Sequence, residues 1–193
     1  LGERFNPFTR QSSEPWVLAN ELKREFDVKE VALTAKEIDK DLNVLLVIHP
    51  RDAQPSTEYA LDQFVLRGGK LIAFVDPYAY FDQAPGPIPG MPGMASSSTL
   101  PRLFKAWGVA MEPKVVSDVV FASGGGQRYT PTVLSLNRTA FARDDVVMAQ
   151  IETLLYAFGG AFSVKPAEGL AVSALISSSA NSMLVDSAQA TVS

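Results

Sequence analysis

The chain contains 193 residues, 47% of them apolar and 20% charged, which is typical of a globular domain large enough to bury its own core. A formal net charge of −4 provides no basic surface for nucleic acid, and the absence of cysteine excludes thiol nucleophiles, disulfides, zinc fingers and iron–sulfur clusters. Because His49 is the single histidine, a histidine metal cluster is also excluded. Carboxylates alone could hold a cation, but no metal or cofactor site is predicted.

No run of about 18 apolar residues is present in the sequence, so no membrane-spanning helix is predicted. Residues 1–4 lack the basic and apolar regions of a signal peptide. We expect residues 1–193 to form a single α/β domain of a longer protein, in which flanking segments provide the membrane anchor.

Apolar periodicity in the first third of the chain alternates between helix and strand. A stripe formed by Trp16, Val17, Leu22 and Phe26 predicts a helix that packs on the core. A continuous apolar run such as VLLVI is typical of a strand that is buried on both faces of a parallel sheet. The elements predicted in this part are a helix at 15–26, a strand at 28–33, a strand at 43–48, a helix at 55–66 and a strand at 71–75.

The turn between the last two of these elements contains Arg67, Gly68, Gly69 and Lys70. Basic residues beside glycines resemble a phosphate-binding loop, but the spacing matches neither G-x-x-x-x-G-K-[ST] nor G-x-G-x-x-G. The glycines follow a helix instead of preceding one, so no helix N-terminus would face a phosphate. We therefore predict that Gly68 and Gly69 end the helix.

The segment at 77–99 interrupts this alternation. It is rich in Pro, Gly, Met and Ser and predicts a long irregular loop that acts as a lid, as a partner-binding segment or as a flexible linker. Regular structure is expected to resume after it. The predicted elements are a helix at 100–107, a strand at 114–121, a hairpin with its turn at 123–127 and its returning strand at 132–136, a helix at 144–158, and weaker strands at 161–164 and 170–176.

The order of these elements predicts an α/β fold with a mostly parallel sheet, flanking helices and a β-hairpin excursion. Ligands of open α/β sheets bind at the carboxyl ends of the strands. His49 and Pro50 directly follow one predicted strand, and Asp76 follows the next. The candidate ligand-binding cleft adds the start of the following helix and two nearby aromatic residues, and it consists of His49, Pro50, Ser56, Asp76, Tyr78 and Tyr80.

Each of these side chains has more than one interpretation. His49 could act as a general base with Asp76 as its acid–base partner, which requires the two groups to lie at hydrogen-bond distance, or it could bond only to the backbone. Asp76 could bind hydroxyls, a cation or an amine, or it could cap the turn that begins at Pro77. The tyrosines suit a carbohydrate or peptide groove, or they could hold the loop on the body of the domain.

Four stretches of the sequence together resemble one family. They are FDVKEV at 26–31, NVLLVIHP at 43–50, YALDQFVLRGG at 59–69 and FVDP at 74–77. The chain resembles the extracytoplasmic domain of the GldG-type auxiliary proteins of ABC transporters, which are named for bacterial gliding motility. The resemblance is strongest over 26–77 and extends more weakly over most of the chain.

This resemblance implies a non-enzymatic domain on the periplasmic face of the inner membrane, anchored by flanking segments and associated with the permease and ATPase subunits of a transporter. It implies a flavodoxin-like sheet similar to that of class I glutamine amidotransferase-like proteins, with a sugar or polysaccharide as ligand, whereas the peptide alternative rests on the tyrosines. The cysteine nucleophile of the amidotransferase-like enzymes is absent, so their activity is not transferred. A hydrolase-like enzyme using His49 and Asp76 and a pure protein-assembly module stay open as alternatives.

Overall fold

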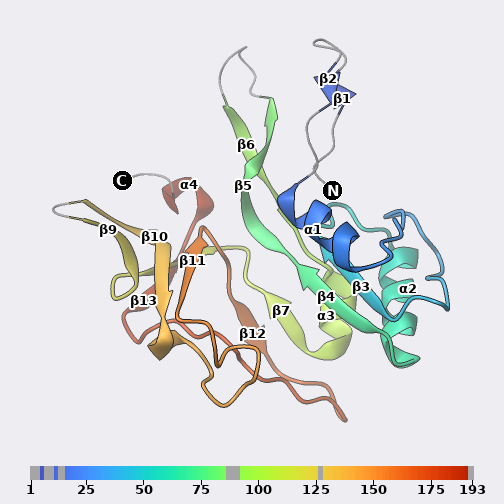
Figure 1. Ribbon diagram of the computed structural model, residues 1–193. Coiled ribbons are helices and arrows are strands. Elements are labelled where there is room, and N and C mark those ends of the chain that lie inside the picture. Colours follow the sequence, from blue (N-terminus) through green and yellow to red (C-terminus); the bar gives the residue numbers. More distant parts are fainter. Residues whose placement is uncertain (1–4, 7–10, 13–15, 86–91, 126–127, 191–193) are drawn as a thin grey trace. The chain divides into compact units, whose positions relative to one another are not determined.

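The computed structural model describes residues 5–6, 11–12, 16–85, 92–125 and 128–190 (Figure 1). Its internal contacts divide the chain into two compact units, Leu1–Ala32 and Leu33–Ser193. The second unit contains every candidate residue named above, so the site is described within that unit.

The first unit contains a short strand pair and one helix. β1 (Phe5–Asn6) pairs antiparallel with β2 (Gln11–Ser12), and α1 (Val17–Glu25) follows. The predicted helix is confirmed, and most of its apolar stripe is exposed, with Trp16, Val17 and Phe26 at 48%, 77% and 66%. The predicted strand at 28–33 is wrong: these residues are exposed, and none of the described strands pairs with them. Without a neighbour an alternating apolar pattern gains no ladder of hydrogen bonds.

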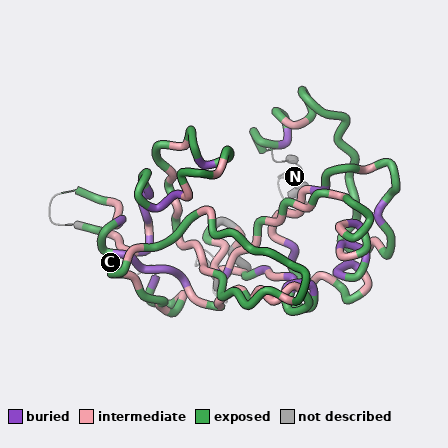
Figure 2. Tube along the Cα trace, turned by 90° about the horizontal axis from the view of Figure 1, so that it is seen from below, coloured by how far each residue is buried: buried purple, intermediate pink, exposed green. Residues whose placement is uncertain are grey.

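The second unit contains the remaining described elements. Its helices are α2 (Pro55–Leu66), α3 (Pro101–Trp107), α4 (Ser187–Ala190) and the 3-10 turn Arg138–Ala140. Its strands are β3 (Val44–Ile48), β4 (Lys70–Phe74), β5 (Asp76–Pro85), β6 (Pro92–Ser98), β7 (Val109–Met111), β8 (Val115–Asp118), β9 (Ala122–Gly125), β10 (Arg128–Asn137), β11 (Thr153–Ala157), β12 (Phe162–Val164) and β13 (Ser182–Val185). Buried residues form short stretches of the chain between exposed loops (Figure 2).

The β3–α2–β4 unit has the predicted order of strand, helix and strand, but the prediction that its strands are buried on both faces is wrong, because Val44, Ile72 and Phe74 are 54%, 49% and 57% exposed. The strands pair in parallel, with Leu45 opposite Leu71 and Val47 opposite Ala73, and these residues belong to the same hydrophobic cluster as the buried face of α2. Pro55 occupies the first turn of α2, where its missing N–H is not needed. The predicted parallel pairing of these two strands is confirmed.

The end of α2 is closed by its glycines, as predicted. Gly68 has a positive φ of 96°, its N–H donates to the carbonyl of Val65 at 2.9 Å, and the N–H of Gly69 donates to the carbonyl of Phe64 at 3.0 Å. This pair of bonds is the Schellman motif. A Cβ atom at Gly69 would lie 2.5 Å from the Phe64 ring, so a side chain there would displace a core residue. The glycines are therefore structural.

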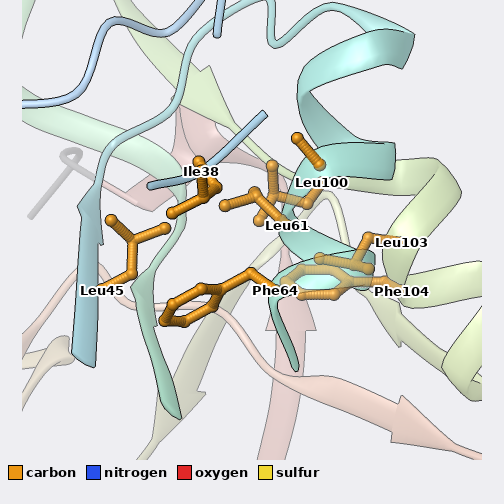
Figure 3. Packing of buried hydrophobic residues seen from close by; sticks show 8 residues of the cluster. Ile38, Leu45, Leu61, Phe64, Leu100, Leu103 and Phe104 are labelled. Carbon is orange, nitrogen blue, oxygen red and sulfur yellow. The ribbon is translucent and has the colours of Figure 1, made fainter. Parts of the chain in front are cut away.

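The first hydrophobic core lies where β3, β4, α2 and α3 meet (Figure 3). Phe64 is completely buried at its centre, between the strands and the aromatic ring of Phe104 on α3. The helix predicted at 100–107 is confirmed as α3, which ends at Gly108 in the left-handed conformation. Burial of a side chain as large as Phe64 typically stabilises a fold by about 1.5–3 kcal/mol.

The segment at 77–99 is not an irregular loop in its described residues. β5 and β6 pair antiparallel and form a long two-stranded ribbon (Figure 1). The pairing carries several register shifts, which accommodate the prolines and glycines that argued against a strand. The central part of the lid or linker predicted here, residues 86–91, lies outside the described residues.

The second core lies among the antiparallel strands that follow α3. A hairpin forms here, but its first strand, β9, occupies residues predicted as the turn, and the strand predicted at 114–121 is observed as β8, which pairs with β13. The helix predicted at 144–158 is wrong. Residues 143–152 form turns in which Val146 is 86% exposed, and β11 then pairs with β10. Of the two weaker predicted strands, the first is confirmed as β12, but the described residues of 170–176 form only a single bridge between Ile176 and Phe141.

Among the described strand pairs, β3–β4 is parallel and the others are antiparallel. The structure is thus mixed α/β with several small sheets. A continuous parallel sheet of the flavodoxin type is not among the described sheets, and that part of the fold assignment stays a prediction.

Candidate functional site

The candidate site begins at the carboxyl end of β3, where the chain turns sharply. His49 has a positive φ of 49°, its N–H donates to the carbonyl of Phe74 at 2.8 Å, and the N–H of Arg51 donates to the carbonyl of His49 at 2.9 Å. Pro50, between them, is fully buried. This tight turn fixes the direction of the His49 side chain and places Arg51 beside it.

His49 joins a cluster of polar side chains contributed by three segments. Its Nε2 atom lies 2.9 Å from Ser96 Oγ on β6 and 3.2 Å from Asp82 Oδ2 on β5. Ser96 donates its hydroxyl hydrogen to the same Asp82 oxygen at 2.8 Å, and Arg51 Nη1 lies 3.0 Å from it. The cluster therefore ties both strands of the β5–β6 ribbon to the end of β3.

This arrangement differs from a catalytic triad in one decisive respect. In a triad the acid and the nucleophile contact opposite nitrogens of the imidazole, whereas here Asp82 and Ser96 contact the same one. With the Ser96 hydrogen directed to Asp82, both neighbours of His49 Nε2 are acceptors, an arrangement that favours the tautomer with its proton on Nε2. The other nitrogen, Nδ1, is buried and has no hydrogen-bond partner among the described residues. Neither nitrogen is free to accept a proton from a substrate in this geometry.

Asp76 does not form the predicted hydrogen bond with His49, whose partners are Asp82 and Ser96. Its Oδ1 accepts the N–H of Tyr78 at 2.8 Å, which is the turn-capping role considered for it, and its own N–H donates to Ser98 Oγ at 3.2 Å. Burial raises the pKa of Asp76 above its ordinary value of 3.8, while the N–H of Tyr78 and the charge of His49 act in the opposite direction. His49 and Asp76 are thus electrostatic neighbours.

The two predicted tyrosines lie on β5 and contact an aromatic residue that the sequence did not single out. Tyr80 stacks on Phe158 with ring centroids 5.3 Å apart, and Tyr78 meets the same ring edge-on at 5.8 Å. Nearby, burial and the negative charge of Asp76 raise the pKa of Tyr156, whose hydroxyl donates to the carbonyl of Gly160. Residues 156–158 therefore belong to the same region, although they were predicted to lie in a helix.

Ser56, the remaining predicted residue, lies in the first turn of α2 and is not one of the residues that these bonds connect. A cavity of about 230 Å³, which does not include Ser56, is lined by Asp52, Ala53, Glu58, Ser97, Ser98, Thr99, Pro101 and Arg102. A larger, mostly apolar hollow of about 600 Å³ runs along α3, β7 and β12 and includes none of the predicted residues.

Glu58 is a buried residue of the smaller cavity that the sequence analysis missed. Its Oε2 accepts the N–H groups of Arg102 at 2.8 Å and of Leu103 at 2.9 Å, so it caps the first turn of α3 from another helix. Leu100, at the N-cap position, cannot provide this bond from its side chain. A helix that begins Leu-Pro without a local cap was the available signal, but the identity of the distant acceptor could not be derived from it.

The described residues show no group of three or more acidic or histidine side chains arranged to hold a metal ion. None of the helices in the described part of the chain has both the length and the apolar character needed to cross a bilayer.

Comparison with known proteins gives one match. A family model described as an ABC-type uncharacterized transport system, auxiliary component, matches residues 3–193. No curated protein and no solved structure matches the chain.

Proposed function

The chain belongs to this family of auxiliary components of ABC-type transport systems, and from that premise we propose that it is a GldG-like, non-enzymatic domain on the extracytoplasmic face of the membrane. The observation that carries the proposal is the extent of the match, which covers residues 3–193 and thus both compact units. The partners proposed for it are the permease and ATPase subunits of the transporter, with anchorage in the periplasmic leaflet supplied by flanking segments.

The chemistry of the His49 cluster supports a binding role over a catalytic one. Nε2 is engaged by Asp82 and Ser96, and Nδ1 is buried, so the ring is used to fasten the β5–β6 ribbon. A general base needs a nitrogen within reach of a substrate proton. The half-exposed ring of Tyr80, stacked on Phe158, offers an aromatic surface of the kind that carbohydrate or peptide ligands contact.

Sidedness can be tested because the 193 residues contain no cysteine. We would introduce one cysteine at the exposed Ser173 in the membrane-bound protein and treat intact cells with a membrane-impermeant maleimide. An extracytoplasmic domain is labelled without lysis, and the unsubstituted protein gives the background. Labelling that occurs only after lysis would place the domain in the cytoplasm and overturn this part of the proposal.

Association with the transporter is tested by co-purification with the permease from detergent-solubilised membranes. The expected result is recovery of the permease with the wild-type protein and with a His49→Ala variant, because the proposal does not require catalysis. Absence of the permease from the wild-type preparation would overturn this part of the proposal.

A further inference from the structure

Glu58, one of the residues that line the 230 Å³ cavity, has a buried carboxylate oxygen without a hydrogen bond. Glu58 is only 2% exposed, and its Oε2 is occupied by two backbone N–H groups of α3. Oε1 accepts no hydrogen bond from any described residue. Arg102 Nη1 lies 3.7 Å from Oε1, within the range of an ion pair but beyond that of a hydrogen bond. A buried acceptor of this kind is stabilised by any donor that enters the cavity.

The formal charges of the side chains that line the cavity indicate whether the hydrogen-bond donor of a ligand would be cationic or anionic. Asp52 and Glu58 contribute two carboxylates against the single guanidinium of Arg102, which leaves the lining with one excess negative charge. A cationic ligand complements this balance, whereas an anion opposes it. The side chain of Arg102 is 64% exposed, so it can turn toward solvent when a cation enters.

The remaining lining and the size of the cavity narrow the ligand further. Ser97, Ser98 and Thr99 provide hydroxyl groups beside the carboxylates. An ammonium group carries three N–H donors, which can be shared between a carboxylate and such hydroxyls, whereas Ca²⁺ takes six to eight oxygen ligands. At about 230 Å³ the cavity is smaller than the usual site for a drug-sized molecule.

We infer that this cavity binds a small primary amine, whose ammonium group donates a hydrogen bond to Glu58 Oε1. The inference rests on Glu58 and its surroundings and does not depend on the side of the membrane on which the domain lies. Amine binding should also be detectable at the backbone amides of Arg102 and Leu103 in α3, because these N–H groups donate to the other oxygen of the same carboxylate.

The test is a titration of the isotopically labelled protein with 2-aminoethanol, followed through the amide resonances of Arg102 and Leu103. Ethylene glycol is the matched neutral probe, because it replaces the ammonium group with a hydroxyl. The expected result is a saturable shift of both amides with the amine and no saturable shift with the glycol. Absence of a saturable shift with the amine, or equal effects of the two probes, would overturn the inference.

Three substitutions and a control sharpen this result. Glu58→Gln keeps an oxygen that can accept from the α3 amides but places an NH₂ group at the other position, and we expect amine affinity to fall at least tenfold. Asp52→Asn, at an exposed position, is expected to weaken binding by about threefold. The exposed Glu37→Gln, outside the cavity lining, should leave affinity unchanged.

Arg102→Gln determines the sign of the ligand charge, with Leu103 as the reporter. Removal of the guanidinium should leave amine affinity unchanged or strengthen it, whereas weaker binding would show that Arg102 attracts the ligand and would overturn the assignment to a cation. If Glu58→Gln fails to fold, Asp52→Asn and Arg102→Gln still decide the question. Wild-type affinity in both Glu58→Gln and Asp52→Asn would contradict the inference.

Discussion

Two regions of the second unit, the β3–α2–β4 unit and the antiparallel strands that follow α3, each contain one fully buried carboxylate among the described residues, and the two carboxylates differ in how many of their oxygens accept hydrogen bonds. Asp118, at the end of β8, is completely inaccessible: its Oδ1 accepts from the N–H of Val120 and the hydroxyl of Ser179, and its Oδ2 accepts from the N–H of Ser179. Glu58, on α2, also holds a distant segment, but one of its oxygens has no donor among the described residues.

The difference separates a structural carboxylate from a candidate binding group. Burial on its own would raise the pKa of Asp118, but hydrogen bonds from Ser179, Val120 and Phe121 together lower it below its ordinary value of 3.8. Both oxygens of Asp118 are therefore committed to holding the backbone. Glu58 caps α3 with a single oxygen, and its second oxygen is buried without a hydrogen-bond donor among the described residues.

The largest expected effect comes from removing the satisfied carboxylate. Asp118→Ala leaves the backbone N–H groups of Val120, Phe121 and Ser179 and the Ser179 hydroxyl without this acceptor, and each unsatisfied buried donor costs about 1–3 kcal/mol. We expect the free energy of unfolding to fall by at least about 3 kcal/mol, measured from urea denaturation midpoints. A loss of less than about 1 kcal/mol would mean that water molecules accept the hydrogen bonds of these donors in the variant. The proposed difference between Asp118 and Glu58 would then be contradicted.

Amide substitutions compare the two carboxylates directly. Asp118→Asn is expected to cost about 2 kcal/mol, because one accepting oxygen becomes a donor that faces other donors. Glu58→Gln is expected to cost less than about 1 kcal/mol, since its single used oxygen is retained, and Glu58→Ala about 2 kcal/mol, since α3 loses its cap. Equal costs for the two amide variants would contradict the comparison.

Acid titration tests the same contrast without a mutation. Because the folded-state pKa of Asp118 is depressed, its contribution to stability is fully present above pH 3.8 and is lost as the pH falls from there toward the folded-state pKa. The stability of the wild-type protein should therefore fall over this range, and Asp118→Asn should show a shallower fall. Parallel curves for the two proteins would show that the lowered pKa makes no contribution.

Asp82 is a partly exposed carboxylate, and its substitution is expected to destabilise the protein less than substitution of Asp118. Asp82→Asn removes the charge that Arg51 and His49 share at the base of the β5–β6 ribbon, and we expect a local loss of about 1 kcal/mol. Hydrogen exchange of the β5 and β6 amides should become faster while that of the α2 amides stays unchanged. Uniformly faster exchange would show that the cluster supports the whole unit and not only the ribbon.

Substitution of Asp76 is expected to change the free energy of unfolding least, and to raise it instead of lowering it. Its raised pKa means that stability falls as the pH rises from 3.8 through the folded-state pKa, because ionisation disfavours the folded form. Asp76→Asn keeps an oxygen for the N–H of Tyr78 and should slightly raise the denaturation midpoint at pH 7. The gain should disappear at pH 3, and a gain that persists there would have a cause other than ionisation.

The parts of the fold predicted correctly are those in which local and tertiary preferences agree. The apolar run at 43–48, Pro55 at a helix start and Gly68–Gly69 at its end all act within a few residues, and β3, α2 and β4 formed as expected. At 144–158 the helical periodicity was outweighed in its last part by pairing of β11 with β10, a tertiary contact that the local apolar pattern does not contain.

The site was located only in outline for the same reason. The carboxyl end of β3 could be identified from the strand pattern, so His49, Pro50 and Asp76 were found. The partners of His49 could not be identified from the sequence, because Asp82 and Ser96 approach it only if the proline- and glycine-rich segment forms an antiparallel ribbon. Glu58 was missed because its role is to cap a helix that begins 43 residues later at Pro101.

The pairing of β13 with β8 has a consequence for the order in which the chain folds. Residues 182–185 complete a sheet whose other strand is residues 115–118, and the bonds between Asp118 and Ser179 span 61 residues of sequence. The parallel unit of β3, α2 and β4 lies within 44–74 and closes a much shorter loop. Closing long loops is entropically unfavourable and slows folding. The β3–α2–β4 unit can therefore form early, whereas β8 and Asp118 gain their partners only when residues 179–185 are in place.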